Sequence, residues 1–122
     1  MGTFALESLE VYALAEQLAD AVWDIIATWE SFAKSTIGHQ LVRAADSVGA
    51  NIAEGYGRAS LADNKRFVRI ARGSLYEMRH FLRRADKRNL LKREQKPEIH
   101  RLLGELLPRL NAYLRSLGKT ES

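Results

Sequence analysis

The fold is decided around the stretch Ser47-Val48-Gly49-Ala50-Asn51-Ile52-Ala53-Glu54-Gly55-Tyr56-Gly57-Arg58. Small residues at its start suit a helix that another helix approaches closely, and the two glycines near its end are predicted to form a turn through their backbone freedom. A polar set recurs in it at steps of three or four residues, which places the set on one helical face. Its members are Ser47, Asn51, Glu54 and Arg58.

Amphipathic patterns on both sides of this stretch predict four helices, over residues of about 8–29, 37–54, 61–89 and 97–117. The third pattern is the clearest, because its apolar residues recur at three-four spacing without interruption. They are Val68, Ala71, Leu75, Met78, Leu82 and Ala85. Four such helices with short connections predict an all-α, up-down-up-down four-helix bundle, formed by residues 1–122 as a single domain.

The predicted helix boundaries depend on particular residues. Glu7 or Ser8 is expected to open the first helix, Ser60 to cap the third, and Pro97 to occupy the first turn of the last. Residues 30–38 break the periodic pattern and are predicted to be a connection. Pro108 lies inside the last helix and predicts a kink or one lost hydrogen bond.

Composition excludes several classes of protein. The 122 residues include no cysteine, which excludes disulfides and cysteine nucleophiles. No apolar run approaches the roughly 18 residues that span a bilayer, and the first seven residues lack the regions of a signal peptide. We therefore expect a cytoplasmic protein without a membrane partner.

Charge is distributed unevenly along the chain. Residues 1–34 hold six acids and one base, a net charge near −5, and the remaining 9 acids and 18 bases give a net charge near +9. Such an uneven charge distribution suits binding to nucleic acid, or binding to a neighbouring copy of the same protein.

Most of the positive charge falls on the third helix, where residues 61–90 contain nine bases and three acids. One flank, here called the basic row, is predicted to contact a phosphate backbone, because it extends over roughly 33 Å and places an aromatic ring among arginines. The row consists of Lys65, Arg69, Arg72, Tyr76, Arg79, Arg83 and Lys87. The alternative is a solvated face, or a surface that pairs with the acidic first helix of a neighbouring subunit.

The polar set of the second helix predicts a structural network rather than a reactive site, since buried charges need partners in any protein. The third helix carries Arg66, Ser74 and Glu77 across from this set, and they are candidates for those partners. We expect Glu54 to pair with Arg66, or Arg58 with Glu77, and so to set how the two helices meet.

No catalytic, cofactor or metal site is predicted. Glu77 and His80 have the Glu-x-x-His spacing of di-iron bundles, but such a site needs a second pair and two further acids. The run from Gly55 to Ser60 shares glycines with phosphate-binding loops, yet it follows a helix and lacks their lysine. An enzyme is therefore not expected.

The second and third helices together carry a family resemblance. Ser47-Val48-Gly49-Ala50-Asn51-Ile52-Ala53-Glu54-Gly55, followed by Gly57-Arg58-x-Ser60 and Arg66-Phe67-Val68-x-Ile70-Ala71-x-Gly73-Ser74-Leu75-x-Glu77, resembles the signature of the bacterial four-helix bundle family encoded by intervening sequences of 23S rRNA genes. The chain departs from the family at Gly49, where proline is usual, and at Phe32-Ala33-Lys34, where an aromatic-proline run is common.

This resemblance implies a bundle that assembles into a closed ring, often of five subunits, and a link to RNA or DNA. It also implies a more distant similarity to accessory proteins of diversity-generating retroelements, which form basic rings. The sequence hypothesis is a non-enzymatic homo-oligomer, by resemblance a pentamer, that binds nucleic acid without base specificity. The alternative is an assembly scaffold or protein-interaction module with no nucleic-acid role.

Overall fold

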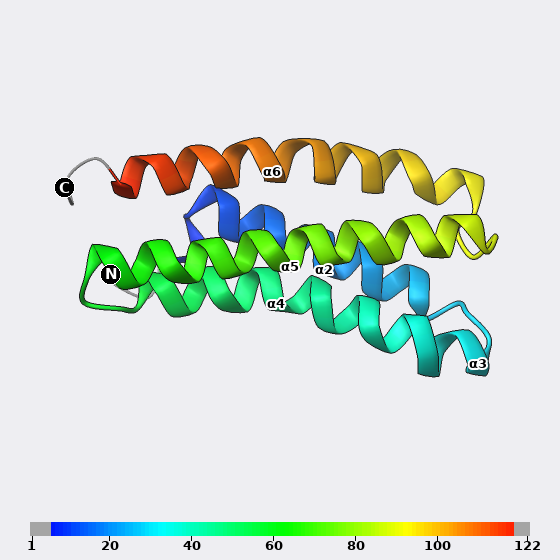
Figure 1. The fold of residues 1–122 in the computed structure, drawn as a ribbon. Helices are drawn as coiled ribbons and strands as arrows, with labels where there is room; N and C mark the ends of the chain where they lie inside the picture. Colours follow the sequence, from blue (N-terminus) through cyan, green and yellow to red (C-terminus); the bar gives the residue numbers. More distant parts are fainter. Residues whose placement is uncertain (1–5, 119–122) are drawn as a thin grey trace.

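The chain forms an all-α four-helix bundle in a computed structural model that describes residues 6–118. Its long helices are α2 (Glu10–Ile26), α4 (His39–Tyr56), α5 (Leu61–Lys87) and α6 (Lys96–Gly118), and no strand occurs among the described residues. Figure 1 shows the helices side by side, each running opposite to the one before it. The predicted fold class is therefore confirmed.

The core lies along the bundle axis, where each helix turns one apolar stripe inward. The helices that pack most extensively are α2 with α4, α4 with α5, α5 with α6, and α6 with α2, so the bundle closes on itself. The stripe predicted for the third helix is the buried face of α5. Burying each large aliphatic side chain stabilises the fold by about 1.5–3 kcal/mol, and those with no exposed surface include Leu18, Leu41, Ile52, Leu75 and Leu106.

The second helix starts earlier than its periodicity predicts. A short helix, α3 (Ser31–Ala33), leads into a π-helical turn, η1 (Lys34–Gly38), which continues directly into α4. Glu30 caps this start, because its Oε1 accepts the Ala33 amide hydrogen at 2.8 Å. The prediction that residues 30–38 form a connection is therefore wrong.

The other boundaries agree with the sequence in part. Ser60 caps α5, its hydroxyl accepting the Asp63 amide hydrogen at 3.0 Å, as predicted. The N-cap of α2 is Leu9 and makes no side-chain hydrogen bond, so the expected opening at Glu7 or Ser8 is wrong. Helix α6 continues through Pro108, and a kink there stays a prediction.

Close packing, rather than backbone freedom, explains Gly55 at the end of α4, whereas a Cβ on Gly57 would make only ordinary contacts at 3.7 Å. No glycine among the described residues has a positive φ, so the predicted turn of that kind is wrong. A Cβ on Gly55 would lie 2.7 Å from Asn64 Oδ1 and 2.9 Å from Phe67 Cβ. Gly55 is therefore required for α4 to approach α5, whereas a Cβ on Gly49 would meet α2 only at the ordinary distance of 3.8 Å.

The end of α5 does use a left-handed residue, but it is Asn89, with φ 62°. The Leu90 amide donates to the Ala85 carbonyl at 2.9 Å, and the Asn89 amide donates to the Asp86 carbonyl at 3.0 Å. This pair of bonds is a Schellman motif with asparagine in the place where glycine is commoner. It turns the chain sharply towards η2 (Arg93–Gln95) and α6.

Candidate nucleic-acid interface

The basic row follows α5 along one flank of the bundle. Because its members recur at steps of three or four residues, they share a helical face. Tyr76 is 52% exposed and Arg69, Arg79, Arg83 and Lys87 are exposed. The remaining two members, Lys65 and Arg72, are half-buried.

The carboxylates of α5 do not neutralise this row. Asp63 lies 3.8 Å from Arg66, Glu77 lies 2.9 Å from Arg43, and Asp86 lies 2.8 Å from Lys96. None of these three cations belongs to the row. Within residues 6–118 no Asp or Glu comes within 4.0 Å of a charged nitrogen of the row, so its positive charge is uncompensated.

Two contacts shape the middle of the row. Arg72 Nη1 donates to Asn111 Oδ1 at 2.9 Å and so ties α5 to α6. The Arg79 guanidinium lies 5.6 Å from the centroid of the Tyr76 ring, within range of a cation–π interaction. Arg72 therefore has a structural role beside its charge, and Tyr76 with Arg79 presents an aromatic face beside a cation.

The ion pairs predicted for the polar set are wrong in their partners. Arg58 pairs with Glu54 on the same helix at 2.7 Å, and Glu77 pairs with Arg43 rather than with Arg58. Arg66 pairs with Asp63 instead of Glu54. All of these side chains are 40–57% exposed, and exposed pairs contribute only about 0–1 kcal/mol each.

The uncharged half of the polar set does join the two helices. Ser47 Oγ and Ser74 Oγ lie 2.9 Å apart, and Asn51 Nδ2 donates to the Ser47 carbonyl at 2.9 Å and to its hydroxyl at 3.0 Å. Ser74 is buried. Within the polar set the Ser47–Ser74 contact, rather than an ion pair, joins α4 to α5. The Arg43–Glu77 ion pair is a second polar contact between these two helices.

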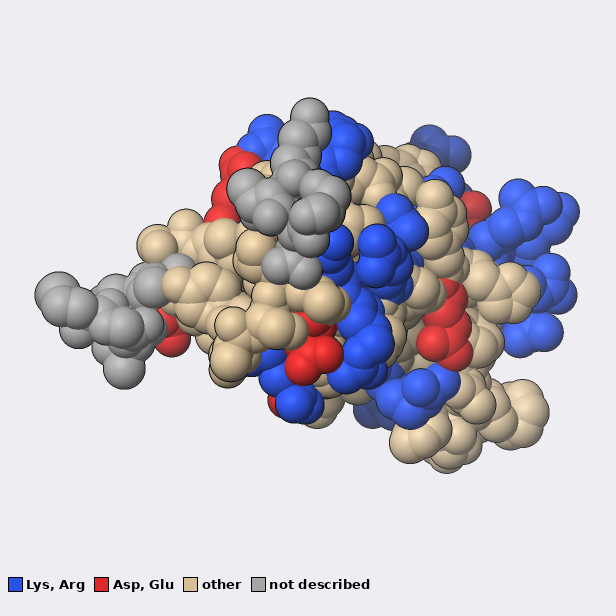
Figure 2. All heavy atoms as spheres, turned by 60° about the vertical axis from the view of Figure 1, so that its left-hand side comes forward, with Lys and Arg blue, Asp and Glu red and all other residues tan. Residues whose placement is uncertain are grey.

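The sequence did not indicate that the Phe67 ring contacts arginine side chains. Its ring centroid lies 4.9 Å from the Arg58 guanidinium carbon and 4.5 Å from that of Arg66. The ring therefore holds two further cations near the connection between α4 and α5. Figure 2 shows the molecule from the side of that connection, where Lys and Arg side chains predominate over scattered carboxylates.

The acidic side of the molecule lies on α2. Among the described residues, no cation lies within 4.0 Å of Glu16, Asp20 or Asp24. Burial raises the pKa of Tyr12, and the neighbouring charge and hydrogen bond of Glu16 raise this pKa further. A groove of about 240 Å³ runs here between α2 and α4, past Gly49. We call Glu16, Asp20 and Asp24 the acidic row.

The Glu77 and His80 pair, which has the spacing of di-iron bundles, lies outside any candidate metal cluster in the part of the chain that the structure describes. No group of three or more His, Asp or Glu side chains is placed to hold a metal ion within residues 6–118. Glu77 is engaged by Arg43, and the His80 ring packs edge-on against Phe81 at 5.2 Å. Over these same residues no helix is long and apolar enough to cross a bilayer.

The chain is similar to a known protein family and to solved structures. A family model described as 23S rRNA-intervening sequence protein matches residues 7–112. A solved structure of a protein of unknown function from the S23 ribosomal protein family of Bacteroides thetaiotaomicron superposes with a TM-score of 0.75. The two chains are 22% identical, and the superposition covers 85% of this chain and 97% of the other. The shared fold is therefore a four-helix bundle.

Curated proteins provide no further guide, since none of them matches this chain. The family match confirms the resemblance that the residues of the second and third helices carry. The more distant similarity to retroelement accessory proteins is untested by these comparisons and stays a prediction.

Proposed function

This chain belongs to the 23S rRNA-intervening sequence protein family, and from that premise we propose that it is a non-enzymatic bundle that binds nucleic acid without base specificity through the basic row of α5. The observation that supports this proposal most is the uncompensated charge of the row. Its six cations have no carboxylate within 4.0 Å in residues 6–118, although α5 itself carries three acids.

The arrangement of the row suits a phosphate backbone. From Lys65 to Lys87 the helix rises about 33 Å, and successive phosphates of one strand are about 3.4 Å apart along a duplex. Cations spaced along a rod can therefore contact several phosphates at once. Contacts between such cations and phosphates carry no information about the bases, so binding is expected to depend on charge and salt rather than on sequence.

We also propose that copies of the chain assemble, with the acidic row of one copy facing basic residues of the next. The acidic row lies on α2, and no cation comes within 4.0 Å of it among residues 6–118. A contact between unlike patches is heterologous, and it closes into a ring when the rotation between neighbours allows it. The resemblance given above implies such a ring, often of five subunits.

The second candidate is a scaffold whose charges serve assembly only. It is favoured by the carboxylates of Glu16, Asp20 and Asp24, which have no cation within 4.0 Å in the described part of the chain and can be paired by cations of a neighbouring copy. If those cations come from the basic row of a neighbour, little charge remains for nucleic acid. The two candidates therefore differ in what the basic row contacts.

The double variant Arg69→Gln with Arg83→Gln separates them. Under the nucleic-acid proposal it weakens binding to RNA and DNA, measured by fluorescence anisotropy at low salt, while sedimentation shows an unchanged assembly. Under the scaffold candidate the assembly dissociates. The nucleic-acid proposal fails if the wild-type protein binds neither single-stranded nor duplex RNA or DNA at low salt.

A matched control removes two arginines whose charges are already compensated. Arg101 lies 3.0 Å from Glu98 and 3.2 Å from Glu105, and Arg109 pairs with Glu10. Arg101→Gln with Arg109→Gln changes the net charge by the same amount as the test variant. Equal weakening by both variants would show that only net charge matters, and it would contradict the assignment to α5.

A further inference from the structure

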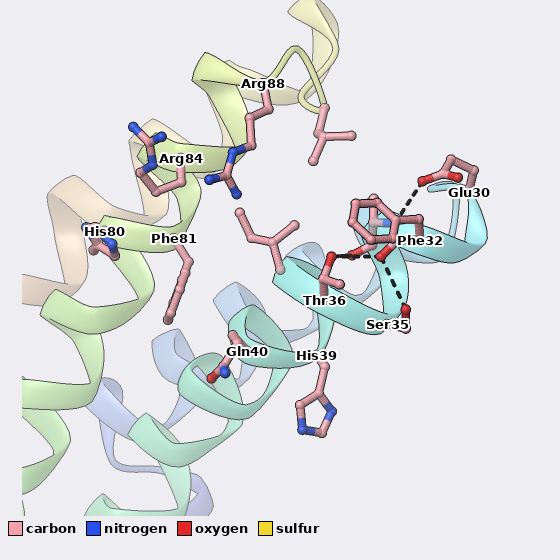
Figure 3. Close-up of a pocket in the computed structure, with 13 residues that line it drawn as sticks. Glu30, Phe32, Ser35, Thr36, His39, Gln40, His80, Phe81, Arg84 and Arg88 are labelled. Carbon is pink, nitrogen blue, oxygen red and sulfur yellow. Dashed lines mark hydrogen bonds between the residues drawn. The ribbon is translucent and has the colours of Figure 1, made fainter.

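A second feature lies beside the end of the basic row, in a cleft of about 760 Å³ between the start of the second helix and the C-terminal end of α5. Its walls come from segments about fifty residues apart in the sequence, around Phe32 and around Arg84. Figure 3 shows the Arg88 side chain reaching into the space between these walls, with the Phe32 ring on the other side. A volume of this size is typical of a small-molecule pocket.

The π-helical turn builds the first wall. A π-helical turn bonds each carbonyl one residue further along than an α-helix does. The Phe32 carbonyl here accepts hydrogen bonds from the Thr36 hydroxyl at 2.7 Å and from the Ser35 hydroxyl at 3.2 Å. The Phe32 ring is left outside the bundle and is 74% exposed, more than any other large apolar side chain among the described residues.

Buried contacts hold this wall in place. A Cβ on Gly38 would lie 3.0 Å from the Ala33 carbonyl oxygen and 3.0 Å from Ile26 Cγ2, so the turn packs tightly against the end of α2. Trp29 Nε1 donates to the Leu90 carbonyl at 3.0 Å and so fastens the segment after α2 to the segment that follows α5. These contacts position the backbone on both sides of the cleft.

The second wall supplies positive charge. Arg84 and Arg88 lie one helical turn apart at the end of α5, and no carboxylate within residues 6–118 comes within 4.0 Å of either guanidinium. Glu30 is the one acid that lines the cleft, and its Oε1 is engaged by the Ala33 amide. His39 and His80 also line the cleft. The cleft is thus lined by an exposed aromatic ring and by two arginines without a carboxylate within 4.0 Å in the described chain.

We propose that this cleft holds one nucleotide of a single-stranded nucleic acid, whose base stacks on Phe32 and whose phosphate is bound by Arg84 and Arg88. Aromatic rings stack on any base, and arginine binds phosphate oxygens in a bidentate manner. The inference rests on the proposed function, because Arg84 and Arg88 each follow a member of the basic row and lie about 100° further round α5. A strand that follows the row reaches the cleft at its end.

A single strand fits this arrangement better than a duplex. The bases of a duplex are stacked on both faces, and inserting one into a pocket requires it to leave the stack, which costs a few kcal/mol. The bases of a single strand are already accessible. The basic row by itself would bind both forms, so a preference for single strands is the particular contribution of the cleft.

The test compares single-stranded and duplex RNA of equal length by fluorescence anisotropy, with the wild-type protein and with Phe32→Ala. The variant is expected to weaken single-strand binding roughly 5- to 100-fold, the range of one base stack, and to leave duplex binding within about twofold. Phe32→Tyr, which keeps an aromatic ring, should retain single-strand binding. Because Phe32 is exposed, the fold should survive each change, as circular dichroism can verify.

Trp23→Ala is the matched control, since Trp23 is 60% exposed and does not line this cleft. An unchanged single-strand affinity in Phe32→Ala would overturn the cleft while the proposed function stands. Equal losses for single strand and duplex would overturn it as well. If the wild-type protein binds neither form, the proposed function fails and the cleft proposal falls with it.

Two further measurements identify what occupies the cleft. A strand that carries 4-thiouridine is expected to form a photo-crosslink to the peptide around Phe32, and crosslinks confined to the basic row of α5 would overturn the proposal. A mononucleotide should compete only weakly, because it lacks the contacts along that row. Competition by a mononucleotide as strong as that of the strand would overturn the assignment to nucleic acid in favour of a free nucleotide.

Discussion

Replacing Gly55 by alanine tests the close approach of α4 to α5. The added Cβ would lie 2.7 Å from Asn64 Oδ1, 2.9 Å from Phe67 Cβ and 3.1 Å from the Asn64 carbonyl oxygen. Two of these three atoms belong to backbone or to a Cβ, so rotating one side chain cannot relieve the contacts. The helices must separate locally, and overpacking of this kind costs about 1–3 kcal/mol.

Alanine also has a compensating effect, because a helix with alanine is more stable than one with glycine by about 0.5–1 kcal/mol. Gly55 lies in the last turn of α4, where this gain is smallest. The net expectation is a loss of about 1–2 kcal/mol in the free energy of unfolding. Urea denaturation followed by circular dichroism should show a lower midpoint with an unchanged slope.

Gly49→Ala is the matched control, because it makes the same chemical change in the same helix. Its Cβ would meet Ala15 Cβ at 3.8 Å and Tyr12 Cε1 at 3.9 Å, both ordinary contacts. Gly49→Ala should therefore raise the free energy of unfolding by about 0.5–1 kcal/mol. A Gly55→Ala protein as stable as the wild type, at equal protein concentration, would refute the argument from close packing.

Three other predictions concern single contacts and charge. Arg69→Gln with Arg83→Gln should reduce the slope of log K against log salt for duplex DNA by about 2, because two phosphate contacts are lost. Ser74→Ala should destabilise the protein by about 1 kcal/mol in urea denaturation, because it removes a buried hydroxyl partner. Trp29→Phe should cost a similar amount, because the Leu90 carbonyl loses its indole donor, and hydrogen exchange should show faster opening of that end of the bundle.

Each of these has a contradicting outcome. A salt slope that changes equally in the Arg101→Gln, Arg109→Gln control would show that the basic row is not the contact. A Ser74→Ala protein of wild-type stability would show that the hydroxyl of Ser47 is satisfied without it. Faster exchange at the opposite end of the bundle only, in Trp29→Phe, would contradict the role given to its indole N–H.

The sequence predicted the helices well where one apolar stripe is continuous. In α5 the stripe from Val68 to Ala85 and the cap at Ser60 are both local signals, and both are confirmed. The start of the second helix was missed for a physical reason. Its π-helical turn, Lys34–Gly38, has a longer repeat than an α-helix. Apolar residues there do not follow the three-four spacing by which a helix is predicted from sequence.

The candidate site divides in the same way. The basic charge of α5 follows from its composition. Which side chains form ion pairs beside the basic row does not follow from it. Glu54 and Arg58 were expected to reach across to α5, yet they pair with each other, because residues four apart on one helix already lie side by side. Glu77 instead meets Arg43, a residue that carried no sequence signal for this role.

The sequence by itself determined the bundle, the acidic first helix and the basic third helix, because helical periodicity and charge are properties of neighbouring residues. Only the tertiary structure decided which charges stay uncompensated and that Phe32 shares a cleft with Arg84 and Arg88. Those outcomes depend on the rotation of each helix about its own axis within the bundle. That rotation is set by packing, such as the contacts of Gly38 and Gly55, between residues distant in the chain.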